Sequence, residues 1–256
     1  MAVREVSCKS LLNLSRLPGA RYVINPYTGC QNSCAYCYAN FMARYSGHEE
    51  PWGEWVDVKM NALDVLEREL KTARKDSVLL SSVCDPYQPL ERKYMMTRRI
   101  LEKLLERDFP VDILTKSMLV LRDTGIIKRF STRRVGLTIT GLEERDRMVL
   151  EPFASSHSDR IMTLRPLKEE GIETYAFVGP ILPGATDLDR VFSDIAGKVK
   201  FALVDRLNMK TSMNPMLDRI AGRDYPQLIN GTDWHSIREK AKEAASRHGV
   251  KAQFLF

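Results

Sequence analysis

The sequence predicts an α/β fold built around a mainly parallel sheet. Short runs rich in β-branched residues alternate with longer stretches whose apolar residues recur at helical intervals, which is typical of βα units. The chain has 256 residues, 44% of them hydrophobic, enough to bury one substantial core. No repeat, low-complexity tract or long Ser/Gly linker divides the sequence, so we expect a single domain over residues 1–256.

Several segments have the composition and length of strands. They are residues 21–25, 78–83, 111–115, 135–140, 174–178, 201–204 and 251–256. The first six alternate with helices, and in parallel α/β barrels the loops after the strands build the active mouth. We therefore expect functional residues at the strand exits. Residues 46–55 and 213–232 are rich in loop-forming residues, which predicts lids or substrate loops.

Four segments have the character of helices. Apolar residues recur at helical intervals over residues 60–73 and 100–105, so both helices should pack on the sheet. Thr97 is a possible N-cap of the second helix. Residues 158–170 and 233–248 have polar starts and are followed by glycine, which often ends a helix.

Composition and charge favour a cytoplasmic enzyme. The sequence shows no charged leader followed by an apolar segment and no apolar run of membrane-spanning length, so we expect no membrane association. The net charge of +6, from 39 basic and 33 acidic residues, permits an anionic partner such as nucleic acid. Basic clusters such as Arg98-Arg99 and Arg133-Arg134 fit a phosphate-binding groove or solvated helix faces, and both interpretations remain open.

Three cysteines, Cys30, Cys34 and Cys37, have the spacing C-x3-C-x2-C, and no fourth cysteine lies nearby in the sequence. Iron–sulfur clusters are usually closed by four thiolates, so a cubane held by three leaves one iron open to a group that is not protein. This predicts chemistry rather than simple electron carriage. An odd total of 5 cysteines, with three in one motif, argues against a disulfide framework and for a reducing compartment.

A structural zinc site is the alternative, because three cysteines and one histidine can close a tetrahedral shell and His48 is within reach in the sequence. Zinc ribbons and fingers normally present two short ligand pairs, and the sequence offers no second pair. His48 also lies in a polar stretch, residues 46–50, where we expect a solvent-exposed loop histidine.

The cysteine spacing, with Tyr36 directly before the last cysteine, resembles the radical S-adenosylmethionine (SAM) superfamily. The resemblance implies a 4Fe-4S cluster whose free iron binds SAM and whose reduced form cleaves SAM to methionine and a 5'-deoxyadenosyl radical. It also implies an incomplete parallel (β/α)6 barrel with a core at about residues 21–208 and a short C-terminal extension at about 209–256. A reductant such as flavodoxin or ferredoxin is the implied partner.

Three further motifs narrow the resemblance. They are Asn-Pro-Tyr-Thr-Gly-Cys at 25–30, Asp-Pro-Tyr-Gln-Pro at 85–89 and Thr-Lys-Ser at 115–117. Together they are similar to the subgroup of spore photoproduct lyase, often described as DNA repair photolyase-like. Glu151 and Arg160 also match the subgroup pattern, and a structural ion pair is the alternative to a site role for them.

Four residues at the second to fourth strand exits are candidate SAM contacts. Asp85 either accepts hydrogen bonds from the SAM ammonium or caps a turn before a proline. The resemblance implies that Lys116 contacts SAM, where its ammonium would pair with the SAM carboxylate. Thr138 and Thr140 face the same side of their strand and would bond the ribose or carboxylate, although ordinary β-propensity explains them nearly as well.

The remaining candidates lie at the fifth and second exits. Gly179 and Ile181 belong to the Gly- and Pro-rich stretch 178–184, where the backbone can approach adenine closely, or which simply forms a stiff turn. Cys84 stands where relatives of the subgroup often have threonine. It is a candidate hydrogen donor to a product radical, and the alternative is a small buried thiol.

Three functions follow as hypotheses. The first is a radical SAM enzyme, in the manner of a lyase, that acts on a large anionic substrate such as a damaged or modified nucleic-acid base. The second is radical SAM modification of a peptide or small metabolite. The third is a non-catalytic zinc-binding module. Resemblance in fold and motif leaves the substrate open.

Overall fold

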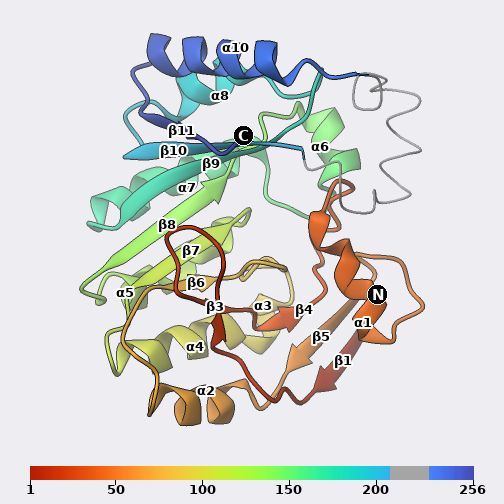
Figure 1. Cartoon of the computed structure of the whole chain (residues 1–256), viewed down its shortest axis with the longest axis vertical. Coiled ribbons are helices and arrows are strands. Elements are labelled where there is room, and N and C mark those ends of the chain that lie inside the picture. The colour runs from red at the N-terminus through yellow and green to blue at the C-terminus, as the bar shows by residue number, and fades with distance from the viewer. Residues whose placement is uncertain (208–230) are drawn as a thin grey trace.

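The structure is a computed structural model, and it describes residues 1–207 and 231–256 of the chain (Figure 1). Most of the predicted loop at 213–232, and the first part of the predicted extension, lie outside the described residues. Within the described part of the chain, no helix is both long and apolar enough to cross a membrane.

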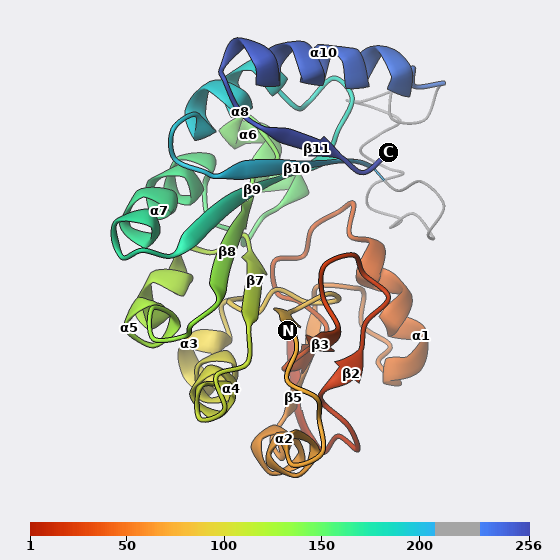
Figure 2. The same ribbon diagram turned by 60° about the vertical axis from the view of Figure 1, so that its left-hand side comes forward.

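The main sheet has eight strands in the order β11-β10-β9-β8-β7-β6-β3-β2. Every neighbouring pair is parallel except β2 and β3. The strands are β2 (Asn13–Leu14), β3 (Tyr22–Ile24), β6 (Val78–Leu80), β7 (Val111–Thr115), β8 (Arg133–Thr138), β9 (Glu173–Ile181), β10 (Phe201–Arg206) and β11 (Ala252–Phe254). The sheet curves but stays open, with β2 and β11 at its edges (Figures 1 and 2). The predicted parallel sheet of an incomplete barrel is confirmed.

All seven predicted strands occur, and all but β7 have shifted ends. β9 continues three residues beyond its predicted end, to Ile181, so Gly179 and Pro180 belong to the strand rather than to the expected turn. The register pairs Val78 with Val111, which sets the starts of adjacent strands side by side. Parallel strands that start together also bring their exits to one edge of the sheet.

Helices cover the outer face of the sheet. They include α2 (Ala62–Leu70), α4 (Met96–Leu105), α5 (Thr124–Ile127), α7 (His157–Glu169), α8 (Leu188–Ile195) and α10 (Trp234–Arg247). Figure 2 shows α4, α5 and α7 along one face and the N-terminal segment with α1 on the other. Shorter elements are η1 (Tyr38–Met42), α1 (Ala43–Ser46), α3 (Glu91–Tyr94), η2 (Met118–Asp123) and α6 (Glu144–Leu150).

Local chemistry accounts for the helix starts. Ser156 and Asp159 form a capping box at α7, and Asp233 caps α10 through the Ser236 amide. The expected cap at Thr97 is wrong, because α4 begins one residue earlier and the Thr97 hydroxyl instead donates to the carbonyl of Pro86. The sequence predicted four of the five helices of eight or more residues that the structure describes, and it missed α8.

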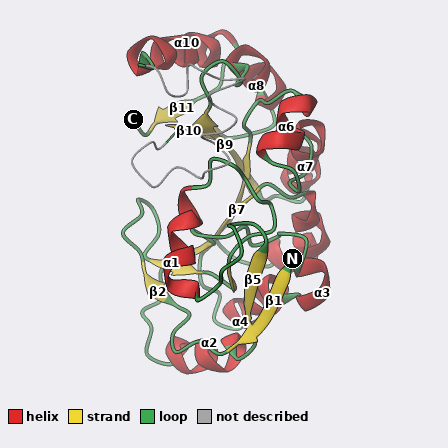
Figure 3. Cartoon of the chain, turned by 90° about the vertical axis from the view of Figure 1, so that its right-hand side faces the viewer, coloured by secondary structure: helices red, strands yellow, loops and turns green. Residues whose placement is uncertain are grey.

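A second, three-stranded sheet was not predicted. It contains β1 (Ala2–Val6), β5 (Trp55–Lys59) and β4 (Tyr27–Thr28), and β1 and β5 run side by side in Figures 1 and 3. The three middle residues of β1 are exposed, so its sequence lacks the apolar alternation that indicates a strand. The predicted lid at 46–55 ends at Trp55, the first residue of the buried strand β5.

The core lies between the main sheet and its helices. Fully buried aliphatic residues from both layers meet there, among them Leu80, Ile113, Leu137, Ile100 and Leu104. Each such side chain contributes about 1.5–3 kcal/mol by leaving water. This packing makes the sheet a rigid support for the loops at the strand exits.

Candidate radical SAM site

The cysteine loop lies between β4 and η1, shortly after β3, the first of the parallel strands of the main sheet. Successive turns shape it: the Ser33 amide donates to the Cys30 carbonyl at 3.3 Å, and the Cys37 amide donates to the Cys34 carbonyl at 3.1 Å. Cys30 and Cys34 are buried and Cys37 is half-buried. The three thiols are therefore held on one compact loop away from bulk water.

Two glycines seat the segment 52–55 against this loop. Gly53 has a φ of +95°, and a Cβ there would lie 2.1 Å from the Ser33 hydroxyl oxygen. Gly29 has a φ of +85°, and its Cβ would lie 2.5 Å from the Trp55 carbonyl oxygen. Both positions need glycine because they combine a left-handed backbone with a close approach. Residues 52–55 of the predicted lid therefore form a fixed wall of the site.

Asp85 joins three of the strand exits. Its carboxylate accepts hydrogen bonds from the Tyr87 amide at 2.8 Å, the Thr115 hydroxyl at 2.6 Å and the Lys116 amide at 2.8 Å. It also accepts one from the Asn32 side chain, inside the cysteine loop, at 3.0 Å. The turn-capping role that was left open is present in the structure. The same carboxylate fixes the cysteine loop to the exits of β6 and β7.

Glu151 is the centre of a second buried network. Its carboxylate accepts hydrogen bonds from Tyr36, Arg160 and the Thr140 hydroxyl, the last at 3.3 Å. Arg160 further donates to the Thr138 carbonyl at 3.1 Å. Burial alone would raise the pKa of Glu151, but the positive charges of Arg160 and Lys116 lower it. The ion-pair interpretation of Glu151 and Arg160 is confirmed, and the pair also holds Tyr36 of the cysteine motif.

Lys116 lies between these two networks. Its ammonium is 5.8 Å from the centre of the Tyr36 ring. Burial would lower the pKa of Lys116, but the neighbouring Cys34 and Glu151 raise it, so the side chain stays charged. A cation is therefore held next to the cysteine loop.

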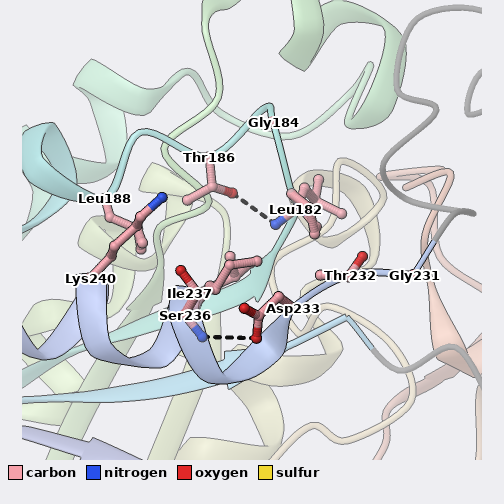
Figure 4. Close-up of a pocket in the computed structure, with 12 residues that line it drawn as sticks. Leu182, Gly184, Thr186, Leu188, Gly231, Thr232, Asp233, Ser236, Ile237 and Lys240 are labelled. Atoms are coloured by element: carbon pink, nitrogen blue, oxygen red, sulfur yellow. Dashed lines mark hydrogen bonds between the residues drawn. The ribbon is translucent and has the colours of Figure 1, made fainter.

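The exits of β8 and β9 are tied together by Thr186. Its hydroxyl donates to the Thr140 carbonyl and accepts from the Leu182 amide, both at 2.9 Å. Ile181 and Leu182 line a cavity of about 420 Å³ that α10 closes with Ser236 and Lys240 (Figure 4). Leu182 also packs in one apolar cluster with Cys34 and Tyr36. Ile181, one of the predicted adenine contacts, thus lines this cavity, whose lining among the described residues includes none from the cysteine loop.

The fold brings Cys84 to the cysteine loop. Cys84 packs against the apolar cluster that contains Cys30, and its thiol faces the Asn25 side-chain oxygen at 3.9 Å. Burial raises the pKa of Cys84 to about 11. It is therefore a neutral, half-buried thiol close to the three motif cysteines, although 47 positions after the last of them.

The donor chemistry of the loop suits an iron–sulfur cluster. Burial raises the pKa of Cys34 to about 12 and that of Cys30 well above its ordinary value, so each thiol needs a strong Lewis acid to become a thiolate at neutral pH. Over residues 1–207 and 231–256, no three His, Cys, Asp or Glu side chains converge as they would around a single ion. A cubane binds each thiolate at a different iron, so its ligands need not converge on a single point.

The expectation of an exposed His48 is wrong. Its ring is buried and stacks on Trp55 with 4.3 Å between ring centres. Its nitrogens contact Glu50 at 3.3 Å and Asp57 at 2.8 Å. Both ring nitrogens are therefore occupied, which removes His48 as the fourth ligand of a zinc site.

Two residues near the loop were missed from the sequence. Asn32 lies inside the motif and bonds Asp85, and Trp52 packs on Cys30 and Cys37. The available signal was the placement of two of the 3 tryptophans, Trp52 and Trp55, in a short polar loop.

Comparisons with known proteins agree with this geometry. The family model of the radical SAM superfamily matches residues 24–193. An uncharacterised protein of Methanocaldococcus jannaschii is 40% identical over 208 residues, which are 81% of this chain and 78% of the relative. The radical SAM Nα-GlyT isomerase of Pseudomonas phage M6 is 28% identical over 169 residues, which are 65% of this chain and 34% of the phage protein.

Solved structures share the fold at low identity. Spore photoproduct lyase complexed with dinucleoside spore photoproduct matches with a TM-score of 0.68 and 17% identity, over 98% of this chain and 82% of that one. SuiB of Streptococcus suis bound to the precursor peptide SuiA matches with a TM-score of 0.58 and 15% identity, over 91% and 47%. Since the family model spans well over half of the chain and contains all three motif cysteines, this protein belongs to the radical SAM superfamily of enzymes.

Proposed function

We propose that this enzyme binds a 4Fe-4S cluster through Cys30, Cys34 and Cys37 and uses it to cleave SAM reductively. When bound, the cluster and SAM supply a 5'-deoxyadenosyl radical that abstracts hydrogen from a substrate, while the protein supplies orientation and excludes water. The observation that carries this proposal is the buried loop of three thiols, joined by Asp85 and Glu151 to the neighbouring strand exits. A protein reductant such as flavodoxin or ferredoxin would deliver the electron.

The SAM contacts predicted from the sequence remain part of this proposal. Lys116 is a charged group beside the loop and is suited to the SAM carboxylate. Thr138, Thr140, Gly179 and Ile181 would meet the ribose and adenine. The Tyr36 hydroxyl already donates to Glu151, and the Asp85 carboxylate already accepts four hydrogen bonds from within the protein. We therefore assign both residues to holding the loop that presents SAM.

Large exposed apolar side chains stand next to the site residues. Tyr38 follows Cys37, Met118 comes two residues after Lys116, and Phe153, 63% exposed, comes two residues after Glu151. The Met118 amide donates a hydrogen bond to the Ser155 hydroxyl at 3.1 Å, so the second and third segments are adjacent. Exposed aromatic rings provide stacking surfaces for unpaired bases.

We favour a nucleic-acid base as the substrate. The net charge of +6 suits a polyanion, and the exposed aromatic rings of Tyr38 and Phe153 suit a flipped or single-stranded base. Peptide modification is the second candidate, supported by the same apolar rim and by the fold shared with SuiB bound to its precursor peptide.

The cofactor proposal is tested by anaerobic reconstitution and reduction with dithionite. The wild-type protein should bind iron and sulfide and release 5'-deoxyadenosine from SAM. Each of Cys30→Ala, Cys34→Ala and Cys37→Ala should abolish that release, and Cys8→Ala, outside the motif, should not. Undiminished release from the three motif variants would reject the ligand assignment.

The proposed donor Cys84 needs a separate readout. Cys84→Ala should keep the iron content and the formation of 5'-deoxyadenosine, because the thiol would act only after the substrate radical has formed. Product from Cys84→Ala with an unchanged yield and structure would rule out hydrogen donation by this thiol.

The substrate proposal is tested with SAM deuterated at the 5' carbon and separate pools of single-stranded DNA, RNA and peptides. Label found in a nucleobase by mass spectrometry would support the nucleic-acid proposal, and label found only in peptides would replace it with the second candidate. Binding to single-stranded nucleic acid should also weaken steeply with salt, because phosphate contacts release counterions.

A further inference from the structure

The indole N–H of Trp52 is a buried donor without a partner. Trp52 is only 8% exposed, and its Nε1 makes no hydrogen bond within the part of the chain that the structure describes. Buried N–H groups almost always have a partner, so an unpaired one next to a binding site indicates an acceptor that arrives with the ligand.

The position of Trp52 limits the acceptor to two sulfurs. Its ring belongs to the same apolar cluster as Cys30 and Ala39, and Cys37 packs against that cluster. The sulfurs of Cys30 and Cys37 are therefore the candidate acceptors that the fold places beside this ring.

The fold holds this tryptophan rigidly. Gly53 packs against Ser33 inside the cysteine loop, and its left-handed backbone allows that approach. On the other side the Trp52 ring meets Trp55 edge to face, with 5.7 Å between ring centres and an angle of 87°. Trp55 in turn stacks on the buried His48. The ring is therefore held in place between the cysteine loop and Trp55.

We propose that the Trp52 indole N–H donates a hydrogen bond to a sulfur of the cysteine loop, that of Cys30 or Cys37, when that sulfur is a cluster thiolate, and thereby raises the reduction potential of the cluster. A donor to a thiolate stabilises negative charge, and the reduced cluster carries one negative charge more than the oxidised cluster. Trp52 thus makes the cluster easier to reduce. This inference rests on the proposed cluster ligands.

The experiment compares reconstituted wild type and Trp52→Phe in the absence of SAM and substrate. Midpoint potentials are measured by titration monitored with electron paramagnetic resonance, at matched iron content. We expect Trp52→Phe to lower the potential by up to about 59 mV, which is a tenfold change in the equilibrium constant of a one-electron reduction. The variant should also lose one exchangeable proton coupling to the reduced cluster. Tyr175→Phe, which removes a buried hydroxyl that donates to Asp112 near the starts of β9 and β7, is the control and should change neither property.

Each outcome bears on the inference. An unchanged potential and proton coupling in Trp52→Phe would overturn it, and so would a shift confined to Trp55→Phe, which would assign the bond to the other unpaired indole. If Trp52→Phe retains too little iron, replacement of Trp52 by 3-benzothienylalanine removes the N–H and keeps the ring shape. Absence of any cluster in the wild type would instead reject the proposed function, so the two failures are distinguishable.

Discussion

Glu151 and Arg160 form an ion pair beneath the cysteine loop, with side chains that are 0% and 2% exposed. The pair is buried because α7 brings Arg160 under the exit of β8, while Glu151 closes the end of α6. Its second function is to hold Tyr36, so that a charged pair in the core determines the position of the cysteine loop. The removal of either partner has a predictable effect on stability.

Arg160→Met should destabilise the fold by about 3–5 kcal/mol, because it leaves the Glu151 carboxylate buried and uncompensated. The measurement is the free energy of unfolding from urea denaturation of the protein without cofactor. Arg165→Met is the matched control on the same helix: it breaks a surface pair with Glu169, 79% and 61% exposed, and should change stability by no more than about 0.5 kcal/mol. Equal effects of the two variants would contradict the buried pairing.

The same pair predicts an acid dependence. The pKa of Glu151 lies below its ordinary value of 4.5, so the native state binds a proton there less readily than the unfolded chain. Its contribution to stability is complete above pH 4.5 and is lost as the pH falls through the native pKa, with a slope of at most about 1.4 kcal/mol per pH unit. The excess in unfolding free energy of wild type over Glu151→Gln should therefore shrink only in that acid range. An advantage that shrinks between pH 8 and 6 would count against this assignment.

Lys116→Met should weaken SAM binding by roughly tenfold or more, because a charged hydrogen bond contributes about 1.5–3 kcal/mol. The measurement is equilibrium binding of SAM to the reconstituted protein, with the iron content of each sample recorded. Lys128→Met removes a surface lysine that pairs with Glu170 and should leave binding unchanged. An unaltered dissociation constant for Lys116→Met would reject its assignment to the SAM carboxylate.

Gly53→Ala and Gly47→Ala separate close packing from backbone strain. Both residues have positive φ, +95° and +66°, but only Gly53 faces a neighbour, whereas a Cβ at Gly47 meets nothing within 4 Å. Gly47→Ala should cost about 1–2 kcal/mol through its backbone. Gly53→Ala should cost about 1–3 kcal/mol more, because the new methyl overlaps Ser33.

The readouts for this pair are the urea unfolding free energy and the amount of iron bound after reconstitution. Gly53→Ala should also lower the bound iron, since its overlap displaces the cysteine loop. If both variants lose stability equally and bind wild-type iron, the segment 52–55 does not support the loop.

Local pattern was sufficient for much of the fold. The alternation of β-branched and helical segments predicted every strand from β3 to β11 except the small-sheet strands β4 and β5. It missed β1 because its middle residues are exposed, and it missed α8 although Leu188, Val191, Phe192 and Ile195 have helical spacing after the Asp187 cap. Both missed elements are short, and a short segment has too few residues for its apolar pattern or its length to identify a strand or a helix.

By itself, the sequence determined the parallel sheet and the three-thiol loop, because strand periodicity and the spacing of Cys30, Cys34 and Cys37 are properties of neighbouring residues. Only the tertiary structure decided what surrounds that loop. Glu151 reaches Tyr36 across 115 positions and Asp85 reaches Asn32 across 53. Such partners are set by the packing of strands and helices in three dimensions, which brings Cys84 close to Cys30 and buries the His48 ring against Trp55.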